Sequence, residues 1–244
     1  MPTNNILRID LHGRHTGDRD PDWEPYGAFS TRATAMGWLA TAEGGLWNTS
    51  EAEDSPGEGI IASYEVSLSS PLPSHDPLPV IPFVACAVDA THRLGGMRLD
   101  GADITLPLHA MRRPGGRNSP REGAIASLLA TAQWYENPCG AEKVSATYRL
   151  TMSNPPDRAD INPWLSELRQ RVVEFYPDQV PHREGRCTQE VVGMCALTDW
   201  SAEPIGWMAA IFAEAARENS ESKYATFAIY RAPREGQSAS RSGG

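Results

Sequence analysis

The sequence predicts an α/β chain assembled from internal repeats. Two strand-like segments match without a gap at an offset of 84 residues: 61–73 (IASYEVSLSSPLP) and 145–157 (SATYRLTMSNPPD). A shorter segment, 224–231 (YATFAIYR), follows the same pattern, and a stretch of small and apolar residues with helical character precedes each copy. A recurring helix-then-strand unit indicates the architecture more strongly than any single motif, because one unit alone cannot bury its own helix. We therefore expect the units to pack on one another.

Hydrophobic periodicity places the elements in order. Alternation of apolar and polar residues predicts six strands, over 6–12, 60–68, 101–108, 144–152, 187–197 and 224–231. Helical spacing predicts five helices, over 27–42, 79–94, 121–135, 162–175 and 203–217. Asn162 before a proline is typical of a helix start, and Gly95 with Gly96 is typical of a helix end. Residues 43–59 read as an exposed acidic loop and 232–244 as a disordered tail.

Composition restricts the class of protein. With 40% hydrophobic and 22% charged residues the chain has an ordinary globular composition. Its net charge of −9 argues against a nucleic-acid partner, which requires clustered Lys and Arg. No signal peptide is visible and no apolar run approaches the ~18 residues of a membrane span. The four cysteines lack CxxC spacing, so we expect free, buried thiols in a cytoplasmic protein, and a homodimer is left open.

Several segments resemble the Rid/YjgF family. The first round is TRATAMGWLATAEGG, then IIASYEVSLSSPLP, then DGADITLPL; the second runs from KVSATYRLTMSNPPD to the YPDQVP turn and EVVGMCAL. The resemblance spans roughly residues 6–231, although no single motif is diagnostic. In that family three subunits pack their sheets around a central barrel. The resemblance thus implies a single-chain, pseudo-threefold barrel of strands with helices outside: residues 1–110 as the first unit, and 111–231 as a second with a partial third.

Strand alternation then sorts the side chains by face. Leu7, Ile9 and Leu11, with the apolar set of 61–68, should lie under the helices. The opposite face, inside the expected barrel, should carry the polar residues, which form the candidate site: Arg8, Asp10, His12, Ser63, Glu65, Ser67, Asp103, Thr105, Arg149, Thr151 and Tyr230. Buried charges are costly unless they are paired. Either these groups pair with one another as structure, for example Glu65 with Arg149, or one carboxylate is left for chemistry.

Glu65 is the carboxylate that we single out as a candidate general base. It lies in the middle of its strand among hydroxyl and aromatic residues, where burial would favour proton transfer. The pair His12 and His15 lacks an evident third ligand, so no metal site is predicted, and no cofactor motif is present. The arginine that the imine hydrolases of the Rid family place before a Leu-Pro pair is missing, because Thr105 stands there.

In size and plan the chain is similar to the bacterial β-carboline-forming Pictet–Spenglerases. That similarity implies a cofactor-free cyclase, which condenses tryptophan or a related arylethylamine with an aldehyde. Glu65 would remove the ring proton, and Arg149 or Arg8 would hold the substrate carboxylate. Two other functions stay open. One is a chorismate-type hydrolase or lyase on Rid-like units, which needs two arginines for a dicarboxylate; the other is a non-catalytic small-molecule-binding module with mutually paired charges.

Overall fold

A computed structural model describes ten segments of the chain: 6–18, 25–38, 47–50, 59–68, 78–93, 95–111, 143–152, 190–197, 199–219 and 222–232. They contain one seven-stranded sheet in the order β2-β3-β1-β4-β7-β5-β6, and every neighbouring pair in it is antiparallel. The strands are β1 (Ile6–His15), β2 (Trp47–Ser50), β3 (Ile60–Ser67), β4 (Met97–Leu106), β5 (Val144–Met152), β6 (Glu190–Leu197) and β7 (Ala225–Arg231).

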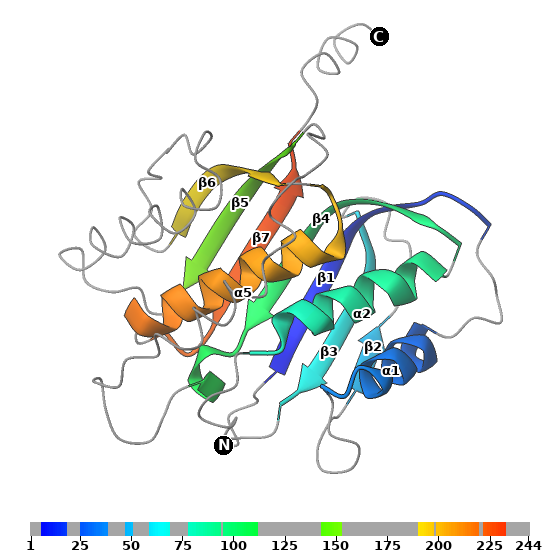
Figure 1. Ribbon diagram of the computed structural model, residues 1–244, viewed down its shortest axis with the longest axis horizontal. Helices are drawn as coiled ribbons and strands as arrows, with labels where there is room; N and C mark the ends of the chain where they lie inside the picture. Colours follow the sequence, from blue (N-terminus) through cyan, green and yellow to red (C-terminus); the bar gives the residue numbers. More distant parts are fainter. Residues whose placement is uncertain are drawn as a thin grey trace, which may run out of the picture.

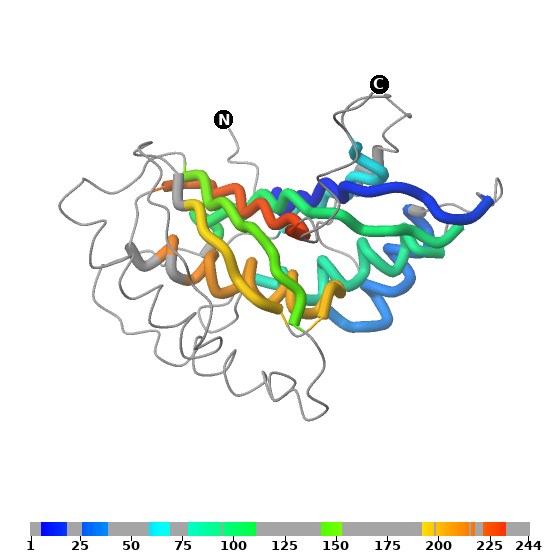
Figure 2. Tube along the Cα trace, turned by 90° about the horizontal axis from the view of Figure 1, so that it is seen from above, coloured from blue at the N-terminus to red at the C-terminus, as the bar shows by residue number. Residues whose placement is uncertain are grey.

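Three α-helices lie on one face of this sheet (Figures 1 and 2). They are α1 (Pro25–Ala35), α2 (Val80–Arg93) and α5 (Ala202–Asn219); a short 3-10 helix, η1 (Leu108–Met111), follows β4. We call the opposite face of the sheet the open face, because none of these three helices covers it (Figure 2). In the part of the chain that the structure describes, no helix is both long and apolar enough to span a membrane.

The expected closed barrel is wrong. Among the described strands the sheet is open, with β2 and β6 as its two edges, because each of them pairs with only one other described strand. The expectation of helices on one side is confirmed, so the predicted barrel interior becomes the open face. An antiparallel sheet with helices on a single face makes the chain α+β.

The six predicted strands and three of the five helices are present, with the largest shift in the first helix, which was predicted over 27–42 and ends at Ala35. Strand β2 was missed, because 47–50 lies within the stretch predicted as an acidic loop. The predicted helix end is confirmed: α2 stops at Arg93, and Gly96, at a φ of +71°, donates its N–H to the carbonyl of His92. The helices predicted over 121–135 and 162–175, and the tail after 232, lie outside the described residues.

The sheet is composed of two units that meet at the β4–β7 pair. The first, β1-α1-β2-β3-α2-β4, has the β-α-β-β-α-β order of a ferredoxin-like unit, with β1 between β3 and β4. In the second, β5 lies between β6 and β7, and α5 connects β6 to β7. This order equates β5 with β1, and not with β3 as the match between 61–73 and 145–157 predicted. In this strand order β7 lies next to β5, within the second group of strands.

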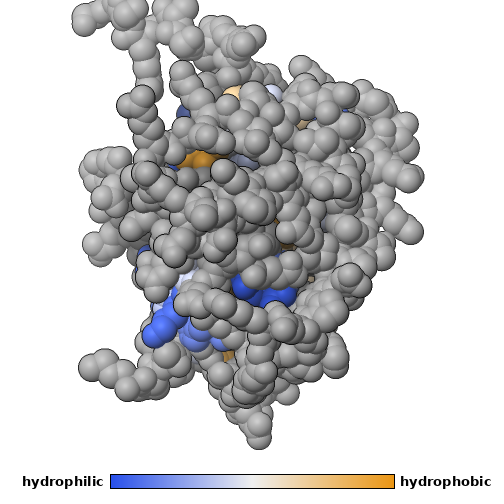
Figure 3. Space-filling view, turned by 90° about the vertical axis from the view of Figure 1, so that its left-hand side faces the viewer, coloured by the Kyte–Doolittle hydropathy of each residue, from blue (hydrophilic) through white to orange (hydrophobic). Residues whose placement is uncertain are grey.

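The core lies between the sheet and the helices. Leu7, Ile9 and Leu11 are fully buried, as predicted, and Tyr64 is 1% exposed. The Tyr64 ring stacks on Phe29 of α1 at a centroid distance of 4.9 Å. In the one face that Figure 3 draws, the apolar residues of the described part are visible as small orange patches. Burying this set drives the helices onto one face and leaves the polar residues of each strand on the other.

Two of the four cysteines fall in the described segments, and both are free and buried, as expected. Cys86 lies in α2 and Cys195 in β6. Burial raises the pKa of the Cys195 thiol to about 12 and also raises that of Cys86. Both thiols are therefore protonated at neutral pH and behave as small apolar groups. Cys139 and Cys187 lie outside the described residues.

Candidate functional site on the open face

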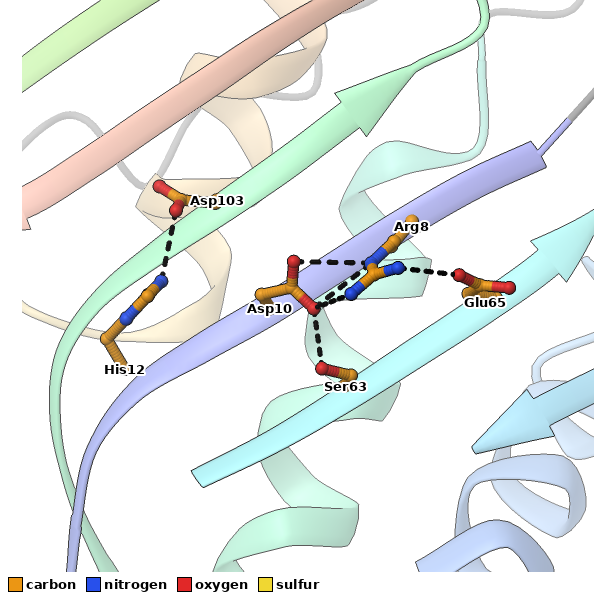
Figure 4. A network of polar contacts seen from close by, with 6 residues as sticks. All are labelled: Arg8, Asp10, His12, Ser63, Glu65 and Asp103. Carbon is orange, nitrogen blue, oxygen red and sulfur yellow. Dashed lines mark hydrogen bonds and ion pairs between the residues drawn. The ribbon is translucent and has the colours of Figure 1, made fainter. Parts of the chain in front are cut away.

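A network of ion pairs joins β1 and β3 on the open face (Figure 4). The Arg8 guanidinium donates to Asp10 through Nε and Nη2, at 3.0–3.2 Å, and its Nη1 donates to Oε1 of Glu65 at 3.0 Å. The Ser63 hydroxyl donates to the same Asp10 carboxylate at 2.5 Å. Arg8 thus pairs with two carboxylates, and the hydrogen bond to Asp10 is the main reason that its pKa is raised.

Strand pairing explains why these groups meet. Arg8 lies directly opposite Glu65, and Asp10 lies opposite Ser63, in the antiparallel register of β1 with β3. Glu65 therefore forms an ion pair with Arg8, and its role as a general base stays a prediction. The alternative partner expected from the sequence, Arg149, lies on β5, four strands away in the sheet. With Arg8 engaged by two carboxylates, the geometry favours Arg149 as an anchor for an external anion.

A second network joins β1, β4 and β7. The Tyr230 hydroxyl donates to Oδ1 of Asp103 at 2.8 Å, and Nε2 of His12 lies 3.1 Å from Oδ2 of the same carboxylate (Figure 4 shows the contact between His12 and Asp103). The His12 ring also contacts the Tyr230 ring at a centroid distance of 5.3 Å. One carboxylate thus holds a phenol and an imidazole side by side.

The electrostatics fix the protonation of this second network. Burial raises the pKa of Asp103, but the hydrogen bonds from His12 and Tyr230, together with the positive charges of His12 and Arg149, outweigh it and lower the pKa overall. Burial and the hydrogen bond to Asp103 raise the pKa of Tyr230. Asp103 is therefore ionised and accepts from both partners, while Tyr230 stays a phenol. Because an ionised carboxylate can only accept hydrogen bonds, Nε2 of His12 is the donor in its contact with Asp103.

A glycine makes room for the tyrosine of this network. Gly101 of β4 pairs with Tyr230 of β7, and a Cβ on Gly101 would lie 2.2 Å from Cδ1 of the tyrosine ring. The ring thus lies directly over the Gly101 backbone. Sequence reasoning missed this residue; the available signal was a glycine within a run of strand alternation, which often marks a close approach.

The remaining predicted residues lie on the same face in a regular pattern. Thr105 of β4 pairs with Thr226 of β7, which pairs with Thr151 of β5, so hydroxyl groups line one row across the sheet. Ser67 ends β3 opposite Ile6. Among the described residues no cluster of His, Cys, Asp or Glu has the number of members needed for a metal site.

Arg149 lies in the row that contains both aspartates. In the register, Asp10 is opposite Asp103, Asp103 is opposite Ala228, and Ala228 is opposite Arg149. Arg149 is exposed, and it is close enough to Asp103 and Tyr230 for its charge to act on both. The second network therefore has an arginine on one side and the Arg8 network on the other.

Compared with known proteins, the chain matches no protein-family model and no curated protein. The case for a function therefore rests on the chemistry of the open face and not on relatives.

Proposed function

We propose that the open face binds a small organic substrate and moves protons on it with the chain's own side chains. The observation that carries this proposal is the His12–Asp103–Tyr230 network, in which one ionised carboxylate orients an imidazole and a phenol. A carboxylate on one ring nitrogen stabilises the imidazolium that forms when the other nitrogen takes a proton. His12 is thus the proposed base, and Tyr230 donates to the Asp103 carboxylate that orients it.

The specific reaction that we propose is the one the sequence suggests, a Pictet–Spengler cyclisation. The amine of tryptophan, or of a related arylethylamine, condenses with an aldehyde, and water leaves to give an iminium ion. The indole ring attacks the iminium carbon, and loss of a ring proton restores aromaticity. His12 would take that proton, and the charges of Asp103 and Asp10 would stabilise the cationic intermediates.

The geometry changes the role proposed for Glu65. Its Oε1 accepts a hydrogen bond from Nη1 of Arg8 at 3.0 Å, so this oxygen is already engaged within the network. We therefore propose that Glu65 holds Arg8 in place. We also propose, from the segments quoted above, that the chain is Rid/YjgF-like.

Turnover of L-tryptophan with a simple aldehyde tests the proposal, with product detected by mass spectrometry. His12→Gln should lower turnover by about 10²- to 10⁴-fold, the usual contribution of a positioned base. Glu65→Gln is the matched variant, because it also replaces one titratable group of the open face with an amide. It should keep turnover within about threefold of wild type per folded molecule. The opposite ranking would restore Glu65 as the base, and no product with the wild-type protein would refute the cyclisation.

A second candidate function is a non-catalytic small-molecule-binding module. The observation that favours it is the mutual pairing of Arg8, Asp10 and Glu65, which leaves none of the three without a partner. This candidate predicts a ligand that binds without being converted. The chorismate-type alternative is less well supported, because it needs two arginines for a dicarboxylate and Arg8 is already engaged.

A further inference from the structure

Both strands that flank β1 contain an extra residue beside His12. In β3 the register with β1 shifts between Leu11 and His12, and Ile61 is the extra residue. In β4 the register shifts between His12 and Gly13, and Asp100 is the extra residue. An extra residue on one strand of an antiparallel pair is a β-bulge, which bends the strand, re-aims side chains and is common beside active sites. The proposed base therefore lies where both neighbouring strands depart from regular pairing.

The bulge in β4 decides which side chain His12 meets. If the pairing at the end of β1 continued without the bulge, Asp100 would lie opposite His12. That slip of one residue would turn Asp103 to the face that the helices cover. With the bulge, Gly101 pairs with His12, and Asp103 lies on the open face with its Oδ2 3.1 Å from Nε2 of His12 (Figure 4). The contact between the imidazole and the carboxylate therefore depends on the bulge.

Gly13 lies between the two bulged strands and contacts both. Its N–H donates to the carbonyl of Gly59, the residue directly before β3, at 2.8 Å. On the other side, a Cβ on Gly13 would lie 2.1 Å from the carbonyl oxygen of Arg98 and 3.2 Å from the amide nitrogen of Asp100. Any side chain at this position would therefore push the backbone of the β4 bulge away from β1. A glycine within a strand often marks such a close approach of two backbones.

Trp200 holds the same bulge from the second unit. Its indole N–H donates to the carbonyl of Leu99 at 2.8 Å, and Leu99 comes directly before the extra residue Asp100. Trp200 lies just before α5 and packs against the hydrophobic core. The β4 bulge is thus fixed by two contacts that can be removed separately, one with Gly13 and one with Trp200.

We propose that Gly13 is a positioning residue for His12: it lets the β4 bulge lie against β1 and thereby fixes the imidazole against Asp103. The inference rests on the proposed function, because it names the residue that aims the proposed base. Gly13 has no side chain to contact a ligand, so it acts through the backbone and should affect proton transfer more than ligand affinity. Displacing a catalytic group by about 1 Å can lower the rate on the order of 10²-fold.

The first measurement reads the contact itself and needs no turnover. The His12 side chain is 16% exposed, so the Nε2 hydrogen held by Asp103 should give a low-field proton resonance at neutral pH. His12→Gln assigns this resonance by removing it. The resonance should be absent from Gly13→Ala and present in the control Gly37→Ala. Gly37 is a matched glycine, because its φ of +71° also disfavours alanine but an added methyl group there meets nothing within 4 Å.

The second measurement is turnover of tryptophan with an aldehyde, expressed per folded molecule. Gly13→Ala should lower kcat by about 10- to 100-fold and keep KM within about threefold of wild type. In an Asp103→Asn background the same substitution should cost less than about threefold, because the contact through which it acts is already lost. Trp200→Phe removes one hydrogen bond from the bulge, so it should weaken the His12 resonance and lower kcat by about 2- to 10-fold.

An unchanged His12 resonance in folded Gly13→Ala would overturn the inference, and so would a wild type without that resonance. An undiminished loss of kcat for Gly13→Ala in the Asp103→Asn background would do the same, because Gly13 would then act by another route. If Gly13→Ala does not fold, Trp200→Phe decides, and an unchanged resonance in that variant overturns the inference. A wild type that shows the resonance but makes no product refutes the proposed reaction, while the comparison of resonances still decides whether Gly13 positions His12.

Discussion

Replacing Arg8 by methionine should destabilise the protein by about 1–3 kcal/mol. Arg8 donates to two carboxylates, and its side chain is 42% exposed, against 20% for Asp10 and 27% for Glu65. Fully exposed ion pairs contribute about 0.2–1 kcal/mol, whereas removing one partner of a buried pair costs about 3–5 kcal/mol. The half-buried Arg8 network lies between these limits. Methionine keeps most of the aliphatic stem, so the loss reports the charge and the hydrogen bonds and little packing.

Double-mutant cycles apportion this loss between the two partners. Of the four hydrogen bonds that Arg8 donates to described residues, three go to Asp10 and one goes to Glu65. The coupling of Arg8→Met with Asp10→Asn should therefore exceed its coupling with Glu65→Gln. The assay is urea unfolding followed by far-ultraviolet circular dichroism, with the free energy of unfolding extrapolated to water. Arg93→Met serves as the exposed control, because Arg93 pairs with Asp89 on the surface of α2.

Two results would refute this reasoning. A loss for Arg8→Met no larger than that for Arg93→Met would show that the Arg8 network is as weak as a surface pair. A coupling energy with Glu65 larger than that with Asp10 would show that Arg8 interacts more strongly with Glu65 than its hydrogen bonds indicate. In the second case Asp10 would be the carboxylate available for chemistry, and its role in the proposed reaction would have to be reassigned.

Two further predictions concern the second network. Because the pKa of Asp103 is lowered in the folded state, its stabilising contribution should be complete above the ordinary carboxyl pKa of about 3.9 and should be lost as the pH falls further, through the folded value. The difference in unfolding free energy between wild type and Asp103→Asn should accordingly shrink between about pH 5 and pH 2, and a constant difference would contradict it. Gly101→Ala should cost about 1–3 kcal/mol, because its Cβ would overlap the Tyr230 ring. The same substitution in a Tyr230→Ala background should cost clearly less, and equal costs would show that the ring is not what the added methyl group meets.

Much of the open face could be predicted because strand alternation is a local property. The period of two placed Arg8, Asp10 and His12 on one face and Leu7, Ile9 and Leu11 on the other, and burial confirms the apolar set. The ends of α2 followed from equally local signals, a run of apolar residues closed by Gly95 and Gly96. These inferences need no knowledge of which strands are neighbours.

The parts that could not be predicted depend on strand order. The sequence match between 61–73 and 145–157 reflects the common pattern of half-buried strands, whereas the sheet order equates β5 with β1. Strand order also decides partners: Glu65 meets Arg8 because β3 pairs with β1, and Tyr230 meets Asp103 because β7 pairs with β4. Strand β2 was missed because four residues within an acidic stretch give too short a pattern for a period to show.

The junction between the two units explains where the candidate site lies. Strands β1 and β5 occupy equivalent positions in their units. On the open face β1 carries several charged residues, whereas β5 carries one, Arg149, between two threonines. The His12–Asp103 pair belongs to the first unit, and Tyr230 reaches it from the second across the β4–β7 pair. Neither unit alone contains the whole network. The network therefore depends on both units belonging to one sheet. Replacing residues at the β4–β7 border should change ligand binding and leave the hydrophobic core of each unit in place.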